Sequence, residues 1–123
     1  MARWILAALL LAVPVYAANK GCPKGTIASQ SATGPNPDII IPSASSLSVQ
    51  ASIVTTGTAT VIVEQSCDGG TNWAKVAGSD MALDVAGTKS MVMTYTAPAC
   101  WFRTNITTCT ACTNVRPAYG CGR

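Results

Sequence analysis

Apolar and polar residues alternate along two stretches in the middle of the chain. Apolar side chains occupy every second position from Leu47 to Ile53, and again from Ala59 to Val63. Side chains on a β-strand point alternately to its two faces, so a period of two predicts strands with one buried face. The sequence TTGT separates the two stretches, and we expect it to join them as a hairpin that turns at Gly57.

Further short apolar segments follow, separated by Gly, Pro, Asp or Ser. They are NWAKVA (72–77), KSMVMTYTA (89–97), CWFRTNITT (100–108) and TNVRPAY (113–119). β-Branched and aromatic residues are common in them, and none shows the three-and-four spacing of apolar residues that indicates a helix. The pattern predicts an all-β fold, a single small antiparallel β-sandwich of the Ig-like or jelly-roll-like kind.

Residues 1–17, MARWILAALLLAVPVYA, have the layout of a secretory signal peptide. One basic residue, Arg3, precedes an apolar run from Trp4 to Val13, and the segment ends with a small residue, Ala17. This order of charge, apolar core and small residue is what the export machinery and its peptidase recognise. We expect cleavage after Ala17, a secreted or periplasmic protein, and no membrane span in the mature chain.

The mature chain is predicted to have two parts. Residues 18–46 are rich in Gly, Pro, Ser and Thr, with GPNPD at their centre, and we expect an irregular N-terminal arm. Its only apolar run, Ile39–Ile41, is a candidate edge strand. Residues 47–123 carry the regular strand pattern and form the predicted β-sandwich domain.

All six cysteines follow the predicted cleavage point. They are Cys22, Cys67, Cys100, Cys109, Cys112 and Cys121. An even number of cysteines in an exported chain predicts three structural disulfides, although the spacing leaves the pairing open. The Cys109-Thr-Ala-Cys112 spacing also fits half a zinc site or a redox pair. Zinc would need further ligands, and the chain has no histidine and no second Cys-x-x-Cys, so we favour disulfides.

The sequence SCDGGTNW, residues 66–73, combines residues that suit a tight turn between two strands. Asp68 can accept hydrogen bonds from turn amides, and Ser66 can close the loop from its other side. Gly69 and Gly70 adopt positive φ at little steric cost, and Trp73 can cover the turn. We therefore assign these five residues a structural role.

The spacing Ser-x-Asp-x-Gly-x-x-Trp resembles the Asp-box hairpin, which occurs in sialidase-type propellers and in unrelated β-modules. The resemblance implies a folding element without chemistry of its own. Asn72 stands where the Thr before the Trp is usual.

The inventory of reactive side chains argues against an enzyme. The chain has 5 acidic residues and no histidine, so it lacks the usual base near neutral pH. A glycosidase needs two carboxylates across a cleft, and the candidate pair here is Glu64 with Asp68. We expect no catalytic residue, no cofactor and no metal. The net charge of +3 is scattered without a basic cluster, which argues against a nucleic-acid surface, so we expect no nucleic-acid partner.

A wider resemblance covers residues 48–119. The segment TGTATVIVEQSCDGGTNWAKVAG, followed later by APACWFRTNIT, resembles small β-sandwich modules of tailed-phage virion proteins. In those modules a strand ending in Glu-x-Ser-x-Asp-Gly-Gly precedes a Trp, and a later strand carries an aromatic-x-Arg segment. Trp101 and Arg103 occupy that later position and are the candidate contact surface.

The resemblance implies a decoration, fibre or tail component that binds other subunits of a particle or a host surface. The signal peptide and cysteines depart from that pattern, because tailed-phage virions assemble in the reducing cytoplasm. We therefore expect an exported, non-enzymatic structural protein, a virion or surface-appendage component. The alternative is a secreted or periplasmic binding module for a carbohydrate or protein ligand, outside any particle.

Overall fold

The structure is a computed structural model that describes residues 19–21, 24–42, 46–54, 57–84, 88–94 and 100–122. These residues form strands in two sheets, and no helix occurs among them. None of them therefore forms a helix long and apolar enough to span a membrane. The predicted signal peptide, residues 1–17, lies outside the described residues.

The first sheet is built around two long antiparallel strands. In order it contains β1 (Asn19–Gly21), β4 (Ile39–Ile41), β10 (Trp101–Thr110), β6 (Thr58–Ser66) and β7 (Ala74–Lys75). Two short strands pair at its sides, β3 (Gly34–Pro35) with β10 and β8 (Met81–Leu83) with β6. The pairing is antiparallel throughout, except that β1 runs parallel to β4.

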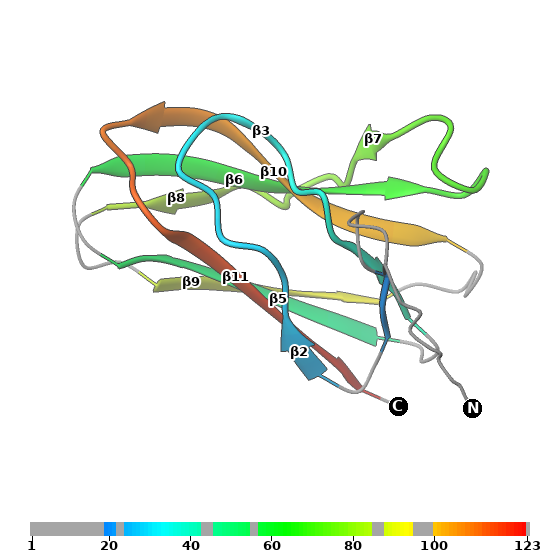
Figure 1. Cartoon of the computed structure of the whole chain (residues 1–123). Coiled ribbons are helices and arrows are strands. Elements are labelled where there is room, and N and C mark those ends of the chain that lie inside the picture. The colour runs from blue at the N-terminus through cyan, green and yellow to red at the C-terminus, as the bar shows by residue number, and fades with distance from the viewer. Residues whose placement is uncertain are drawn as a thin grey trace, which may run out of the picture.

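The second sheet is antiparallel and has four strands. Its order is β2 (Lys24–Thr26), β11 (Val115–Gly122), β5 (Ser46–Ile53) and β9 (Thr88–Thr94). Figure 1 shows the two layers, with β6 and β10 in one and β11, β5 and β9 in the other. The predicted all-β sandwich is confirmed.

The core lies between the two sheets and follows the alternation in the sequence. Leu47 and Val49 of β5 are fully buried, as are Val61 and Val63 of β6, and Phe102 is the largest fully buried side chain among the described residues. Each strand therefore contributes every second side chain to one shared apolar layer, which is how aligned sheets form a sandwich.

The predicted hairpin between β5 and β6 is wrong. β5 pairs with β11 and β9 in the second sheet, whereas β6 pairs with β10, β7 and β8 in the first. The chain crosses from one layer to the other near Gly57, so the two strands face each other through the core (Figure 1). Alternation tells which face of a strand is buried, but it does not tell which strand lies beside it.

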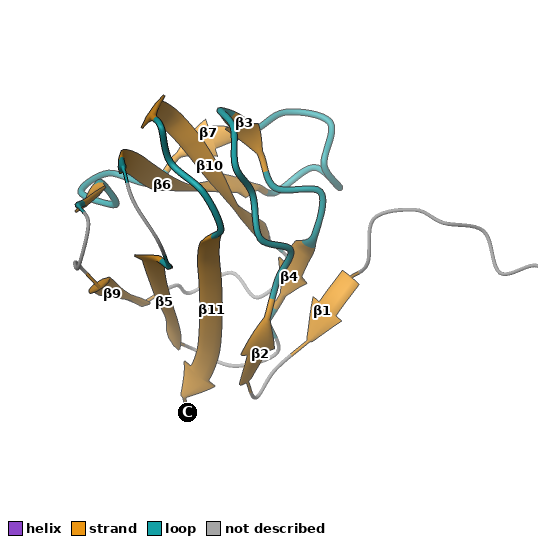
Figure 2. Cartoon of the chain, turned by 60° about the vertical axis from the view of Figure 1, so that its left-hand side comes forward, coloured by secondary structure: helices purple, strands orange, loops and turns teal. Residues whose placement is uncertain are grey.

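The expectation of an irregular arm also needs correction. Residues 19–21 and 24–41 contribute strands to both sheets, and Ile27 and Ile40 belong to the core. Figure 2 shows β2 beside β11, with β1 beside β4 in the other sheet. These strands have only two or three residues each, too few to show an alternation in the sequence.

Between Ile27 and Asp38 the regular pairing is limited to β3 and to a bridge between Gln30 and Val115, and polar side-chain contacts hold the rest. The buried Asn36 side chain donates to the Ala28 carbonyl over 2.6 Å, and its backbone N–H donates to the Thr104 carbonyl over 2.8 Å. The Asp38 carboxylate accepts from the Ala28 N–H at 2.9 Å. A Gly- and Pro-rich segment is therefore ordered by side chains that satisfy its backbone.

The remaining segments differ from prediction mainly in length. β7 has two residues where six were expected, and β8 was not expected at all. Between them the hydroxyl of fully buried Ser79 accepts from the Val63 N–H over 3.0 Å and donates to the Val63 carbonyl over 3.2 Å. The Ser79 hydroxyl therefore forms hydrogen bonds with the backbone of β6 at a position between β7 and β8, where neither strand pairs with it.

Two disulfides are described. Cys67–Cys100 joins the end of β6 to the start of β10, next to the paired residues Ser66 and Trp101. Cys109–Cys112 closes the crossing from β10 to β11. Cys121 is also disulfide-bonded, no described cysteine is free, and Cys22 lies outside the described residues.

Candidate functional site

The candidate site is the hairpin loop between β6 and β7 and the outer face of the strands below it. The loop begins where the Cys67–Cys100 disulfide fastens β6 to β10. Gly69 and Gly70 have φ of 75° and 88°, a left-handed conformation that other residues rarely adopt. The two glycines let the chain reverse within a few residues and return to β6 at Ala74.

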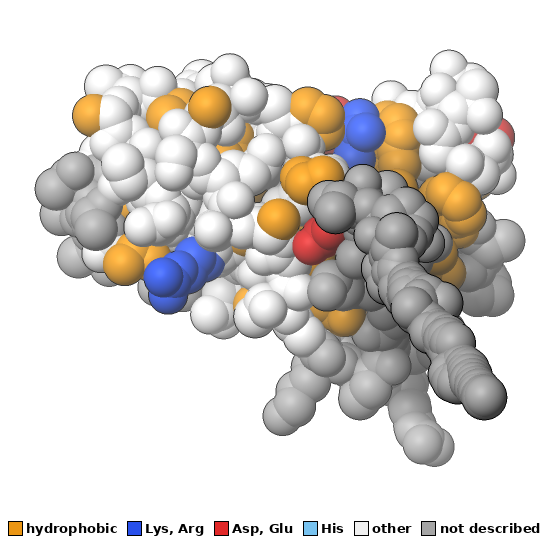
Figure 3. Space-filling model, in the orientation of Figure 1, with side chains coloured by type: hydrophobic (Ala, Val, Ile, Leu, Met, Phe, Trp, Pro, Cys, Tyr) orange, Lys and Arg blue, Asp and Glu red, His pale blue; other side chains and the backbone are white. Residues whose placement is uncertain are grey.

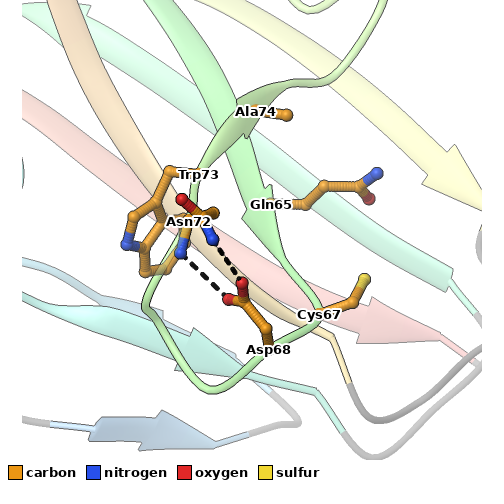
Figure 4. Close-up of a pocket in the computed structure, with 6 residues that line it drawn as sticks. All are labelled: Gln65, Cys67, Asp68, Asn72, Trp73 and Ala74. Atoms are coloured by element: carbon orange, nitrogen blue, oxygen red, sulfur yellow. Dashed lines mark hydrogen bonds between the residues drawn. The ribbon is translucent and has the colours of Figure 1, made fainter.

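Asp68 is the centre of the loop. Its Oδ1 accepts from the Ser66 hydroxyl at 2.7 Å, the Thr71 N–H at 3.1 Å and the Asn72 N–H at 3.0 Å. Its Oδ2 accepts from the Asn72 side-chain amide at 2.9 Å, as Figure 4 shows. The Ser66 oxygen in turn accepts from the Gly70 N–H at 2.9 Å. The structure thus brings the predicted turn residues into one hydrogen-bonded network.

These bonds favour the ionised form of Asp68. The Asn72 N–H, then the Ser66 hydroxyl and the Asn72 side chain, lower the pKa of the carboxyl from 3.8 to about 2. Hydrogen bonds donated to a carboxylate stabilise its charged form. At neutral pH Asp68 is therefore an anion whose two oxygens are both engaged, and it is a poor proton donor.

Trp73 lies on the side of the loop and joins it to the sheet. Its indole N–H donates to the Gly70 carbonyl over 3.1 Å, and the Arg103 guanidinium carbon lies 4.2 Å from the centre of its ring. A cation over an indole face at this distance is stabilised by the charge distribution of the ring. Trp73 thus covers the turn, as predicted, and also holds Arg103.

Arg103 is fixed from its other side by Glu64. Its Nε donates to Glu64 Oε1 over 2.7 Å, and Asn105 Nδ2 donates to Oε2 of the same carboxylate over 3.1 Å. The side chains of Arg103 and Glu64 are 21% and 14% exposed. Because both side chains are partly buried, solvent and salt screen this charge-assisted pair less than they would screen a fully exposed pair.

Trp101 completes the outer face beside Arg103. A Cβ placed on Gly70 would lie 3.2 Å from the Trp101 ring and 3.7 Å from the Trp73 ring, so the Gly70 backbone runs close to both indoles. Both tryptophans and Arg103 remain partly exposed. We call Trp73, Trp101 and Arg103 the outer-face cluster; Figure 3 shows basic and hydrophobic side chains together in the region of β7.

A pocket of about 340 Å³ lies on the other side of the same hairpin. Gln65, Cys67, Asp68, Asn72, Trp73 and Ala74 line it (Figure 4). The Gln65 amide projects away from the loop and makes no hydrogen bond within the described part of the chain. Such a pocket offers amide donors and acceptors beside an aromatic wall.

Sequence reasoning missed Glu64 and Asn105 as parts of this site. The sequence suggests Glu64 only as a possible catalytic partner of Asp68 and as the first residue of the Glu-x-Ser-x-Asp-Gly-Gly segment. In the structure the two acids bind different groups. Glu64 and Arg103 are directly opposite in the β6–β10 register. The sequence shows their opposite charges, but only the pairing of β6 with β10 shows that the two side chains are neighbours. The described residues contain no cluster of metal-ligating side chains.

Comparisons with protein-family models, with curated proteins and with solved structures found no match to the chain. The fold and the hairpin by themselves define a small disulfide-bonded all-β protein with an aromatic and basic outer face.

Proposed function

We propose that this chain is an exported, non-enzymatic structural or binding protein, a phage-derived virion or surface-appendage component that contacts other subunits or a host surface. The observation that carries the proposal is the outer-face cluster, in which Trp73, Trp101 and Arg103 are partly exposed and the Arg103 guanidinium lies against the Trp73 ring. Tryptophan and arginine are the residues most enriched where protein contacts concentrate binding energy.

The way the cluster is held supports a contact role. Arg103 is oriented by Glu64 and Trp73 before any partner arrives, so little side-chain entropy is lost on binding. The disulfide Cys67–Cys100 fastens the strands at the base of the loop. Disulfides also agree with an oxidising compartment, where an exported particle component would reside.

The engagement of the acids supports a non-enzymatic role. Asp68 is bonded to loop amides with a pKa of about 2, and Glu64 is bonded to Arg103 and Asn105. A general acid must hold a proton near the working pH, and the Asp68 carboxyl, with its lowered pKa, does not.

The pocket beside Gln65 favours a second candidate, a secreted or periplasmic binding module for a carbohydrate or protein ligand. The pocket has a free amide, an aromatic wall and no unpaired charge. Polar groups that lack internal partners are available to a neutral ligand.

Sedimentation separates the two candidates. Particles released by cells that produce the protein are banded on a density gradient, and the protein is detected in each fraction by an antibody. Co-sedimentation with particles or filaments is the expected result. A protein found only in the soluble fractions would overturn the particle proposal in favour of the free binding module.

Variants then test the outer-face cluster. Trp101→Ala is expected to reduce the amount of protein in the particle fractions at least several-fold, because a large aromatic contact is lost. The matched control is Val54→Ala, which shortens an exposed apolar residue elsewhere, 46% accessible. Equal incorporation of the two variants would show that the cluster is not the contact surface.

A further inference from the structure

β9 is a long strand at the open edge of the second sheet. It pairs with β5 along all seven residues from Thr88 to Thr94, and no other described strand pairs with it. Figure 2 shows β9 at the outer side of its sheet, with no described strand beyond it. Its second row of backbone N–H and C=O groups therefore faces outward without a strand partner in the described part of the chain.

The other strands at the sheet margins are much shorter. β1, β2 and β8 have three residues each, and β7 has two. Proteins commonly protect edges by making them short, by bulges, by proline or by charged residues. β9, with the sequence TKSMVMT, has no proline and no glycine, and its only charge is Lys89, opposite Ala51 near one end of the strand. It is the longest of the described edge strands and offers six further residues without charge to another strand.

We propose that β9 is the contact between two copies of this chain, which associate through antiparallel β9 strands across a two-fold axis. The two four-stranded sheets would then join into one continuous sheet. Strand addition at an exposed edge is a recurrent mode of association, and a two-fold axis presents the same surface from both copies.

The sequence of β9 is compatible with this self-pairing. An axis through Met91 pairs all seven residues, whereas any other register leaves some of them without a partner. In that register Lys89 lies opposite Met93 of the second copy, so the two lysines do not face each other. Directly opposed like charges would destabilise a strand pair, and here there are none. A second copy is therefore a fitting occupant of the edge.

The contact is independent of whether the protein enters a particle. A protein that dimerises in solution but does not co-sediment with particles would support this inference and overturn the particle proposal. A protein that co-sediments with particles but stays monomeric in solution would overturn this inference and support the particle proposal.

Sedimentation equilibrium of the purified exported protein tests the contact. Because edge pairing buries a small area, we expect dissociation in the range of about 1–100 µM, with the mass rising from one chain to two across it. A protein that keeps the mass of one chain up to about 1 mM would contradict the inference.

Charge variants test the register. Residue 90 of one copy lies opposite residue 92 of the other, so Ser90→Lys with Val92→Lys places two lysines face to face in both pairs. This double variant is expected to be monomeric. Ser90→Lys with Val92→Glu places opposite charges in the same positions and is expected to restore the dimer. Failure of the restoration would overturn the proposed register.

A matched control keeps the added charge but moves it off the edge. Ser48 and Gln50 are exposed on β5, directly beside Val92 and Ser90 in the same chain. Ser48→Lys with Gln50→Lys should therefore remain dimeric. Circular dichroism of each variant confirms that it folds. A monomeric control, or a dimeric Ser90→Lys/Val92→Lys variant that is folded, would overturn the contact at β9.

Discussion

Asp68 shows how one exposed side chain can determine the shape of a loop. The carboxylate accepts four hydrogen bonds from Ser66, Thr71 and Asn72, and these replace the backbone pairing that a tight reversal lacks. The same bonds lower its pKa from 3.8 to about 2. The loop is therefore sensitive to the protonation of this single group.

Because the pKa of Asp68 is lower in the folded protein, its contribution to stability is present above about pH 4 and is lost as the pH falls toward about 2. We expect Asp68→Asn to lower the melting temperature at pH 7 by about 5 °C, because an amide donor then faces the Asn72 amide. The difference from the native protein should shrink as the pH approaches 2. Thermal melts between these pH values measure it.

Asp84→Asn is the control, since Asp84 is an exposed aspartate outside the hairpin. Its melting temperature should follow that of the native protein over the whole pH range. Parallel profiles for Asp68→Asn and the native protein would contradict the role assigned to the Asp68 carboxylate.

The buried hydroxyl of Thr104 is expected to lower the stability of the folded protein. It lies on the core side of β10 between Phe102 and Ile106, and its hydroxyl is buried without a hydrogen-bond partner among the described residues. Valine has nearly the same shape without the hydroxyl. Thr104→Val should raise the free energy of unfolding by about 1 kcal/mol, as measured by urea denaturation. A loss of stability would show that the hydroxyl has a partner in solution.

At the scale of elements, the crossings between the two sheets define the fold. The β5–β6 crossing passes close to the β10–β11 crossing, where a Cβ on Gly57 would lie 2.2 Å from the Ala111 carbonyl oxygen. Gly57 also has a φ of +99°. Ala111 itself has a positive φ of 50° inside the loop closed by the Cys109–Cys112 disulfide. The two crossings are therefore packed backbone to backbone at one end of the sandwich.

Gly57→Ala should be strongly destabilising, because the new methyl group meets backbone atoms that cannot move aside. We expect a loss of about 3 kcal/mol or more in the free energy of unfolding. Gly78→Ala is the control: Gly78 also has a positive φ, of 76°, but its Cβ would meet nothing within 4 Å. It should lose only about 1 kcal/mol in the same chemical denaturation. Equal losses would mean that the close approach is absent.

At the scale of the whole molecule, a light core makes the disulfides important. Phe102 is the only phenylalanine, and most of the other core residues are Val, Ile, Leu and Ala. A domain of this size has a stability of about 5–15 kcal/mol, of which one disulfide can supply about 2–4 kcal/mol. Cys67–Cys100 closes a separation of 33 residues, and Cys109–Cys112 one of 3.

Reduction is therefore expected to lower the melting temperature sharply, or to unfold the protein at ambient temperature. Replacing Cys67 and Cys100 by alanine should cost more than replacing Cys109 and Cys112, because the longer loop restricts the unfolded chain more. Circular dichroism melts with and without reductant, and of the two double variants, measure both effects. A shift of only a few degrees on reduction would mean that the sheets are stable without the bonds.

The alternation from Leu47 to Ile53 and from Ala59 to Val63 determined by itself that these segments are strands and which of their faces is buried. The octet from Ser66 to Trp73 likewise determined a turn, because glycine conformation and aspartate hydrogen bonding act within a few residues. Both are local properties, so a single sequence contains them.

The tertiary structure decided which strands are neighbours. Leu47 and Val61 bury their side chains in the same core, yet β5 and β6 belong to different sheets. Only the β6–β10 pairing puts Glu64 opposite Arg103, and only the return of the hairpin puts Trp73 over the guanidinium. These contacts join residues up to 41 positions apart, as between Glu64 and Asn105. Their geometry depends on the packing of all the strands together, which no local pattern contains.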